Sequence, residues 1–220
     1  MSGLAATLDH LVVGCADLAR GAAWLERFLG VTLSPVGQHA AMGTHNRLVA
    51  IGEQAYLELI AIDPSAAKPS HPRWFGLDTT DVQERIAQRP RLIGWVARVD
   101  NIEATMTHTG DVLGRVHNMQ RGDFSWRVSV PEDGHPIEGG LIPHLIEWQG
   151  TLHPCDRLPQ QSCKFTWMEA AHPNPAKVQY LLDEIGLPPK TLVMTPSPPY
   201  SGMTMCAYID TPLGTRTLMS

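Results

Sequence analysis

The sequence predicts an α+β fold assembled from a repeated βαβββ module, and two observations lead to this expectation. Two strand-like segments, residues 56–60 and 145–148, each carry one isolated glutamate among apolar neighbours. Each segment closes a stretch that opens with a strand, an Asp or Asn, and an amphipathic helix, and a similar opening begins near residue 164. Self-similarity of this kind indicates that one supersecondary unit has been duplicated.

The repeat divides the chain into units that we expect to pack as a single compact body. A chain of 220 residues can bury a sizeable core. Stretches rich in proline and polar residues mark the boundary after the second unit. The predicted units are a first βαβββ module at residues 1–90, a second module at 91–150, a linker at 151–163, and a partial third module at 164–220.

The elements of the first module follow from apolar spacing and from helix and turn signals. Residues 8–15 are apolar and β-rich, which is typical of a buried strand. Asp17 fits a helix N-cap, apolar side chains recur after it at helical spacing, and Gly30 suits the end of that helix. Residues 46–51 and 55–62 have the pattern of two strands joined by a tight turn.

The second module restarts this pattern, and the third repeats part of it. After a short helix within residues 71–89, the second module is predicted to hold a strand at 92–99, a helix at 101–109, and strands at 124–130 and 141–148. The third is predicted to hold a strand at 164–170, a helix that ends at Gly186, and a closing hairpin of 203–210 and 215–219.

Composition and charge disfavour several classes of protein. The formal net charge is −5 and no basic cluster occurs, which disfavours nucleic acid and acidic membrane surfaces as partners. No apolar run is long enough to cross a bilayer, and no basic segment precedes the apolar residues 11–13, so a secretory signal is not expected. The four cysteines are scattered without C-x-x-C spacing, which predicts reduced thiols in a cytoplasmic protein.

Several segments resemble the vicinal oxygen chelate superfamily and, within it, the glyoxalase-like domain subgroup. The resemblance covers nearly the whole chain and is carried by LDHLVVGCADLARGAAWLERFLGV, HAAMGTHNRLVAIGEQAYLELIAID, LIGWVARVDNIEA, HLIEWQG, HPNPAKVQYLLDEIGL and YIDTPLGTRTL. The superfamily includes glyoxalase I and the extradiol dioxygenases. The resemblance implies that the duplicated modules form a U-shaped mixed-sheet barrel, and that modules pair either within one chain or across a homodimer.

The resemblance also implies a site on the first and last strands of the two modules, where the superfamily places up to four metal ligands. His10, Glu58 and Glu147 match three of these positions, and the fourth falls at Gly94, which has no side chain to coordinate a metal. One histidine and two carboxylates would suit a divalent transition metal such as Ni, Zn, Mn or Fe. The metal would act as a Lewis acid while Glu58 and Glu147, as catalytic residues, shuttle protons.

The same strand acids also allow a pocket without a metal. Glu58 would then pair with Arg47 or Arg98, and Glu147 would pair with Arg127. If these arginines point inward, they form a charge-paired pocket that binds an anionic or polar ligand.

Further candidates for ligand binding come from a turn and from the strands. Asn46 closes a Gly-Thr-x-Asn stretch that follows His39, and its glycine allows a sharp turn or a close approach to a ligand. Trp95 and Trp126 would line an apolar pocket floor, although aromatic residues in strands are more often plain core. His144 has the strand parity opposite to Glu147 and is therefore expected to face away from the site.

Three functions remain open from the sequence. The first is a glyoxalase-type lyase or isomerase that binds a small oxygenated or anionic metabolite in the barrel, with a divalent metal. The second is a metal-free ligand-binding or resistance protein that sequesters its ligand in the same fold. The third is a structural or interaction protein, in which the repeat only builds a barrel and His10 is a hydrogen-bonded core histidine.

Overall fold

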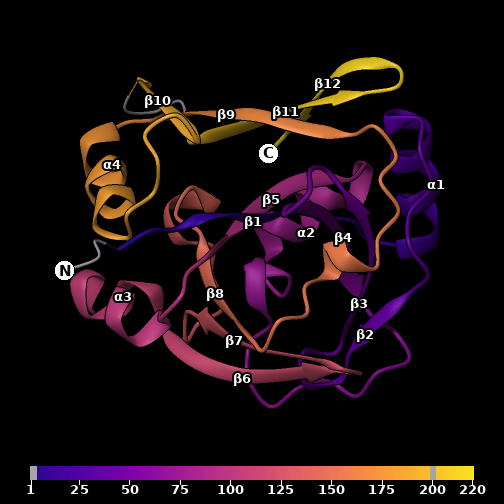
Figure 1. Cartoon of the computed structure of the whole chain (residues 1–220), viewed down its shortest axis with the longest axis horizontal. Coiled ribbons are helices and arrows are strands. Elements are labelled where there is room, and N and C mark those ends of the chain that lie inside the picture. The colour runs from indigo at the N-terminus through magenta and orange to yellow at the C-terminus, as the bar shows by residue number, and fades with distance from the viewer. Residues whose placement is uncertain (1–3, 199–201) are drawn as a thin grey trace.

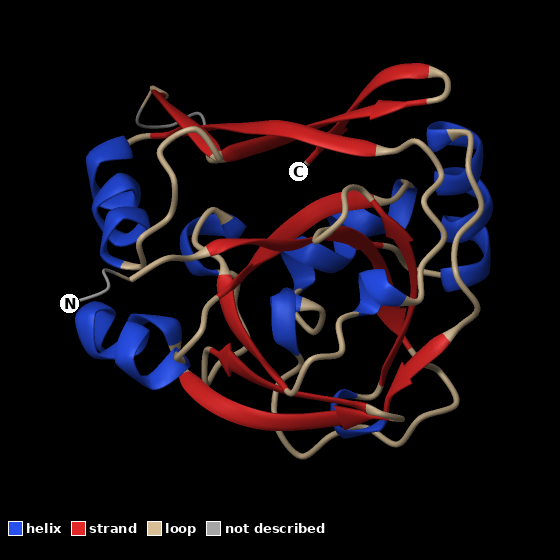
Figure 2. Ribbon diagram, in the orientation of Figure 1, coloured by secondary structure: helices blue, strands red, loops and turns tan. Residues whose placement is uncertain are grey.

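The structure is a computed structural model that describes residues 4–198 and 202–220 (Figure 1). Within this part of the chain, an eight-stranded mixed sheet curves almost into a barrel, and a separate four-stranded sheet lies across one side of it. Figure 2 shows the strands of the large sheet curving around the centre of the molecule, with the small sheet above them in this view. The α+β class and the U-shaped mixed-sheet barrel expected from the sequence are confirmed.

The first module supplies one half of the large sheet. Its elements are β1 (Thr7–Gly14), α1 (Leu18–Leu29), β2 (Gly37–His39), β3 (Thr44–Ala50) and β4 (Tyr56–Ile62). Asp17 caps α1, because its side chain accepts a hydrogen bond from the Arg20 amide at 2.8 Å, and Gly30 ends the helix in a left-handed conformation. The last strand, β4, runs parallel to the first, β1.

The second module repeats this order after the connecting helix α2 (Thr80–Gln88). Its elements are β5 (Arg91–Arg98), α3 (Ile102–Thr109), β6 (Arg115–Arg121), β7 (Phe124–Val130) and β8 (His144–Gln149). Here too the last strand, β8, runs parallel to the first, β5. The modules meet where β1 pairs antiparallel with β5. Both halves of the barrel come from one chain, so its closure does not require a second copy.

The large sheet is open between its two edge strands, β2 and β6. The strand order is β2-β3-β4-β1-β5-β8-β7-β6. Figure 1 shows the end of β6 close to β2 and β3, where the two arms of the U approach each other. The sequence pattern did not predict β6, because its side chains are all exposed or half-buried and lack an apolar period.

The C-terminal unit forms the small sheet, in the order β10-β9-β11-β12. Its elements are β9 (Lys164–His172), α4 (Pro175–Glu184), β10 (Leu192–Pro196), β11 (Thr204–Thr211) and β12 (Gly214–Met219). The strand after the helix, β10, pairs in parallel with β9, whereas in both modules the last strand pairs with the first. This unit therefore has the element order of the repeat with a different strand connectivity.

Two apolar clusters lie on opposite faces of the large sheet, because alternate residues of a strand point to opposite sides. The outer cluster includes Leu11 and Trp95 and joins the barrel to α1 and to the small sheet. The inner cluster includes Val12 and Val96 and fills much of the barrel. The candidate site described below lies on this inner face.

Among the described residues, none of the helices combines the length and the apolar character needed to cross a membrane. All four cysteines are free thiols.

Candidate functional site

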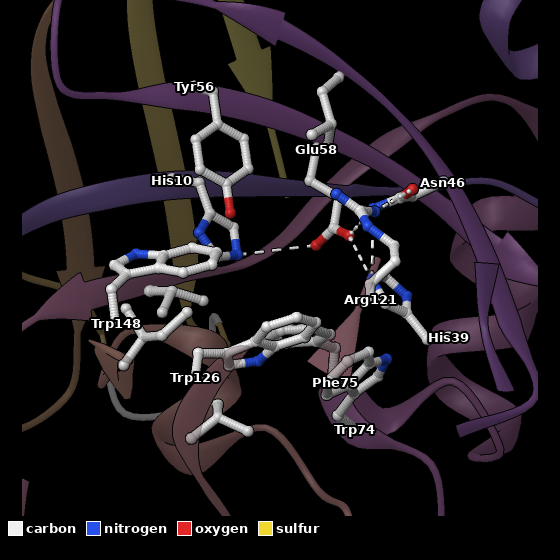
Figure 3. Close-up of a pocket in the computed structure, with 14 residues that line it drawn as sticks. His10, His39, Asn46, Tyr56, Glu58, Trp74, Phe75, Arg121, Trp126 and Trp148 are labelled. Carbon is white, nitrogen blue, oxygen red and sulfur yellow. Dashed lines mark hydrogen bonds and ion pairs between the residues drawn. The ribbon is translucent and has the colours of Figure 1, made fainter. Parts of the chain in front are cut away.

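The barrel encloses a small cavity that is lined by both modules (Figure 3). Its volume of about 30 Å³ is enough for one or two water molecules. Aromatic and aliphatic side chains form much of the wall. The polar lining consists of His10, His39, Asn46, Tyr56, Glu58 and Arg121.

Glu58 is the central acid of the cavity. It lies in the middle of β4 and is only 5% exposed. Asn46 Nδ2 donates a hydrogen bond to Glu58 Oε1 at 2.6 Å, and His39 Nε2 lies 3.9 Å from the same oxygen. His10 Nε2 lies 3.6 Å from the other oxygen, Oε2. These polar neighbours are required because a buried carboxylate without partners is strongly destabilising.

His10 is oriented by Asp9, its neighbour in β1. His10 Nδ1 lies 2.7 Å from Asp9 Oδ1, while Trp148 Nε1 and His153 Nε2 donate to Asp9 Oδ2 at 2.9 and 3.2 Å. Burial raises the pKa of Asp9, but the hydrogen bonds from His10 and His153 outweigh it and hold this pKa far below its ordinary value. Because an ionised carboxylate only accepts hydrogen bonds, His10 Nδ1 carries a proton and Nε2 is left for the cavity.

A β-bulge explains how the Asp9 carboxylate reaches the ring beside it. Successive residues of a regular strand point to opposite faces of the sheet. The pairing of β1 with β5 shifts register between Leu8 and His10, which locally breaks that alternation. Sequence reasoning missed Asp9 because a period of two assigns it to the face opposite His10.

His39 is a buried histidine in the cavity wall. It ends β2, and its Nδ1 lies 3.2 Å from Thr44 Oγ1. Burial lowers the pKa of His39 to about 4, helped by the charges of Arg121 and His10 and opposed by that of Glu58. The ring is therefore neutral at pH 7 and interacts as a hydrogen-bonding group rather than as a cation.

Arg121 brings positive charge to the site from the end of β6. Its Nη1 donates to Asn46 Oδ1 at 3.0 Å, across the open edge of the barrel. Gly37 makes this reach possible, because a Cβ at that position would lie 2.5 Å from both Arg121 Nη1 and Asn46 Oδ1. Among residues 4–198 and 202–220, no carboxylate forms a salt bridge with Arg121, so its charge is available to an anionic ligand.

Aromatic rings complete the wall. Tyr56 stacks on His10 with ring centroids 4.5 Å apart, and the rings of Trp126 and Trp148 are 5.5 Å apart. Phe75 enters from the connection between the modules and has a left-handed backbone, with φ 56°. Non-glycine residues rarely adopt this conformation, and when they do they often lie at functional sites.

The structure brings four of the polar residues singled out from the sequence together in this cavity, along with Trp126. His10, His39, Asn46 and Glu58 all come from the first module and all line the cavity. Figure 3 shows the Glu58 carboxylate between His10 on one side and Asn46 and His39 on the other.

Glu147, in contrast, lies on the outer face of β8. Its Oε2 accepts a hydrogen bond from the Ile102 amide at 2.8 Å, and Arg127 Nη1 lies 3.5 Å from the same oxygen. The cavity is lined instead by its neighbours Ile146 and Trp148. Glu147 therefore does not converge with His10 and Glu58 as expected, because the residues on either side of it in β8 are the ones that face into the barrel.

The other predicted ligand-binding residues also lie outside the cavity. Arg47 Nε donates to a backbone carbonyl of the segment before β3 at 2.6 Å, and Trp95 Nε1 donates to the Leu141 carbonyl at 3.0 Å in the outer cluster. Arg47, Trp95 and Arg127 lie on the outer face of their strands, and each is next in sequence to a residue that lines the cavity. Arg98, the last residue of β5, borders a separate surface cleft and donates to a glutamine side chain at 3.1 Å.

The strand register identifies which residue of the second module corresponds to Glu58. Val12 pairs with Glu58 between β1 and β4, and Val96 pairs with His144 between β5 and β8. His144 therefore occupies the equivalent position. It is buried, its Nδ1 lies 2.6 Å from the Ser129 carbonyl, and burial lowers its pKa to about 4. The alternation of side chains along the strand correctly predicted that His144 and Glu147 face opposite sides of the sheet. However, His144 is the residue on the inner face.

The side chains present do not fit a metal ion. In the described part of the chain, no three His, Cys, Asp or Glu side chains are placed to hold one. The second module has Gly94 at a predicted ligand position, and Phe75 Cδ1 would lie 3.6 Å from a Cβ built there. The Phe75 ring also packs against His144, with centroids 4.6 Å apart. The apolar ring thus occupies the part of the barrel where the second module would have to supply ligands.

The family model described as a glyoxalase-like domain matches residues 8–186 of this chain. No curated protein matches the sequence.

Solved structures share the fold at low sequence identity. A hypothetical protein from Staphylococcus aureus aligns with a TM-score of 0.57 and 14% identity, over 96% of this chain and 84% of that chain. A methylmalonyl-CoA epimerase from Mycobacterium tuberculosis aligns with a TM-score of 0.43 and 19% identity, over 69% of this chain and 93% of that chain. A methylmalonyl-CoA epimerase in complex with methylmalonyl-CoA and NH4+ aligns with a TM-score of 0.43 and 14% identity, over 69% of this chain and 100% of that chain. The likeness to the staphylococcal protein concerns the fold alone.

Proposed function

Because the chain belongs to the glyoxalase-like domain family, we propose that its barrel binds a small oxygenated, anionic metabolite and transfers a proton on it, as a lyase or isomerase does. The observation that carries this proposal is the grouping of Glu58, His10 and Arg121 around one buried cavity. An acid–base pair beside an unpaired guanidinium supplies both proton transfer and charge recognition. The site proposed here works without a metal, since its donor set does not fit one.

Arg121 supports the binding of an anion. A guanidinium can hold a carboxylate through two parallel hydrogen bonds, which fixes the orientation of the ligand as well as its charge. Asn46 steadies Arg121 on one side and Glu58 on the other, since its Oδ1 accepts from Arg121 and its Nδ2 donates to Glu58. The carboxylate would therefore sit toward the open edge of the barrel, with the rest of the ligand extending inward.

Glu58 and His10 support proton transfer. Glu58 Oε2 and His10 Nε2 are 3.6 Å apart, which is beyond a strong hydrogen bond and leaves both atoms available to a ligand. Glu58 Oε2 would remove a proton from the carbon next to a carbonyl and leave an enolate on the ligand. His10 Nε2 would take that proton from Glu58 and give it back to the enolate or to solvent, which restores both residues. Asp9 keeps the opposite ring nitrogen of His10 protonated, so the relaying atom always faces the ligand.

A bound metabolite needs more room than one or two water molecules. The cavity of about 30 Å³ must therefore widen on binding, through a change of rotamer in the lining. All four cysteines are free thiols, and we propose a cytoplasmic location, where thiols stay reduced.

A second candidate function is binding without chemistry. Five aromatic side chains line the cavity, namely Tyr56, Trp74, Phe75, Trp126 and Trp148. Such a wall favours flat organic ligands through stacking, as a sequestering protein would require. The two functions differ in whether a bound ligand exchanges protons with solvent.

Proton exchange on a small 2-oxo acid tests the proposal. The C3 protons of pyruvate are followed by proton NMR in deuterated buffer, with and without the protein. Wild-type protein is expected to accelerate deuterium incorporation, and His10→Gln should reduce the acceleration by roughly 100-fold, the usual contribution of a general acid–base group.

The matched control is His135→Gln, which replaces an exposed histidine in a loop outside the cavity. This variant should retain the wild-type exchange rate. Binding of pyruvate without exchange would favour the sequestering function, and a wild-type protein that binds no small carboxylate would overturn the proton-transfer proposal.

A further inference from the structure

Trp74 carries a buried hydrogen-bond donor that the protein itself leaves unused. The side chain lines the cavity and is only 4% exposed. Its Nε1 makes no hydrogen bond with any of the described residues. A buried N–H without a partner is destabilising and uncommon in folded proteins, so such a donor calls for a physical reason.

Two other indoles of the barrel have hydrogen-bond acceptors. Trp95 Nε1 donates to the Leu141 carbonyl at 3.0 Å, and Trp148 Nε1 donates to Asp9 Oδ2 at 2.9 Å. These two donors, on the outer side of the barrel and in the Asp9 network, are satisfied, whereas the donor of Trp74, a residue that lines the cavity, has no partner within the described part of the chain. Figure 3 shows Trp74 below His39 and next to Phe75 in the ring of lining residues.

The position of Trp74 is fixed by its neighbours along the chain. Arg73, itself buried, donates from Nη1 to Asp78 Oδ1 at 2.6 Å and from Nε to the Gly43 carbonyl at 3.3 Å. On the other side, the Gly76 amide donates to the Gly134 carbonyl at 2.7 Å. The backbone between these anchors is left-handed at Phe75. The unpaired donor is therefore held in place by a constrained segment rather than left over from a loose loop.

We infer that Trp74 Nε1 donates a hydrogen bond to the 2-oxo oxygen of a small 2-oxo carboxylic acid. This inference rests on the proposed function, in which Arg121 holds the carboxylate. An indole N–H only donates, so its partner must be an acceptor, and a neutral carbonyl oxygen suits an uncharged donor. The same bond would stabilise the negative charge that develops on the carbonyl oxygen when the neighbouring carbon loses a proton to Glu58.

A comparison of two ligands isolates this one contact. Pyruvate and propionate share a carboxylate and a three-carbon chain, and only pyruvate has the 2-oxo oxygen. Their dissociation constants are measured by calorimetry for wild type, Trp74→Phe and Trp95→Phe. We expect wild type to prefer pyruvate by roughly fivefold to tenfold, the range of one neutral hydrogen bond, and Trp74→Phe to bind both acids alike.

Trp95→Phe is the matched control, because it removes a buried indole N–H outside the cavity. It should keep the preference for pyruvate but lower the urea midpoint of unfolding, since the Leu141 carbonyl loses its donor. Trp74→Phe should lower that midpoint less, because both variants lose buried ring surface but no hydrogen bond of the free protein is lost at Trp74.

The outcomes separate this inference from the proposed function. If wild type binds neither acid, the proposed function fails and the inference with it. If wild type binds both acids through Arg121 but Trp74→Phe retains the preference for pyruvate, only the role of Trp74 is overturned.

Discussion

The two halves of the barrel have the same architecture and different linings. The first module places His10, His39, Asn46 and Glu58 in the cavity. The second module lines it with Val96, Trp126, Val128, Ile146 and Trp148, and adds one charge, Arg121, from its edge strand. At the position equivalent to Glu58 it has His144, whose ring packs on Phe75 and does not line the cavity.

This difference shows how a duplicated scaffold can divide its tasks. The repeat fixes strand positions that face inward in both halves, and the side chains at those positions decide the chemistry. The first half carries histidines and a carboxylate in a buried network, while the second supplies apolar surface and one guanidinium, which we propose as the anion-binding group. We therefore expect substitutions at matching places in the two halves to have unequal effects on ligand chemistry.

The two halves should contribute alike to a loss of stability in acid. The expected fall in the free energy of unfolding is large. His39 and His144 each have a pKa lowered to about 4, against 6.5 for an ordinary histidine. Between these two pH values the unfolded chain binds more protons, so the free energy of unfolding falls as the pH falls. The difference corresponds to roughly 3 kcal/mol for each histidine. Urea unfolding at pH 7 and at pH 4.5 would measure most of this loss.

Single variants assign the acid effect to each half. His39→Gln and His144→Gln should each reduce the loss of stability between pH 7 and pH 4.5 by about half, because each removes one of two similar titrations. Asp9 stays ionised throughout this range, since its pKa is far below it. A loss that is unchanged in both variants would show that burial of these rings does not govern the acid response.

Charge recognition should depend on which face of the second module an arginine occupies. Arg121→Met should weaken the binding of pyruvate by roughly 10- to 100-fold, the range for a hydrogen bond to a charged group. Arg127→Met removes a guanidinium that pairs with Glu103 and Glu147 outside the cavity, and should change the affinity by less than about twofold. Calorimetric titration of both variants makes the comparison, and equal losses would contradict the assignment of the anion site to Arg121.

Two glycines on the inner side of the barrel provide a smaller and sharper comparison. Gly37→Ala places a Cβ 2.5 Å from Arg121 Nη1, so the guanidinium must move, and the affinity for pyruvate should fall by roughly fivefold. Gly94→Ala meets only Phe75, at an ordinary contact distance of 3.6 Å, and should leave the affinity unchanged. Retained affinity in Gly37→Ala would mean that the reach of Arg121 across the barrel opening is not needed for binding.

Much of the fold could be predicted because its signals are local. The strand at 8–15 and the capped helices after Asp17 and Asn101 follow from apolar spacing and from side chains that satisfy the free helix amides. The edge strand β6 and the short strands β2 and β10 were not predicted. Edge strands carry mixed side chains and depend on pairing with a neighbour, which leaves little pattern in the sequence itself.

The site was harder to predict, because it depends on register and on long-range contacts. Glu147 was an isolated strand acid like Glu58, and only the pairing of β5 with β8 shows that it faces outward. Asp9 reaches the network through a bulge that no residue type marks. Arg121 and Trp74 come from an edge strand and from the inter-module connection, and they meet the cavity only once the barrel closes. A lone arginine in an otherwise unpatterned segment offered no signal.

The two strand glutamates should have unequal roles, and one paired measurement tests this directly. Glu58→Gln and Glu147→Gln make the same isosteric change, and glutamine can still accept the hydrogen bonds from Asn46 or from the Ile102 amide. Deuterium exchange at C3 of pyruvate should fall by roughly 100-fold or more in Glu58→Gln and stay within about twofold of wild type in Glu147→Gln. Equal losses in the two variants, or full exchange in Glu58→Gln, would contradict the account.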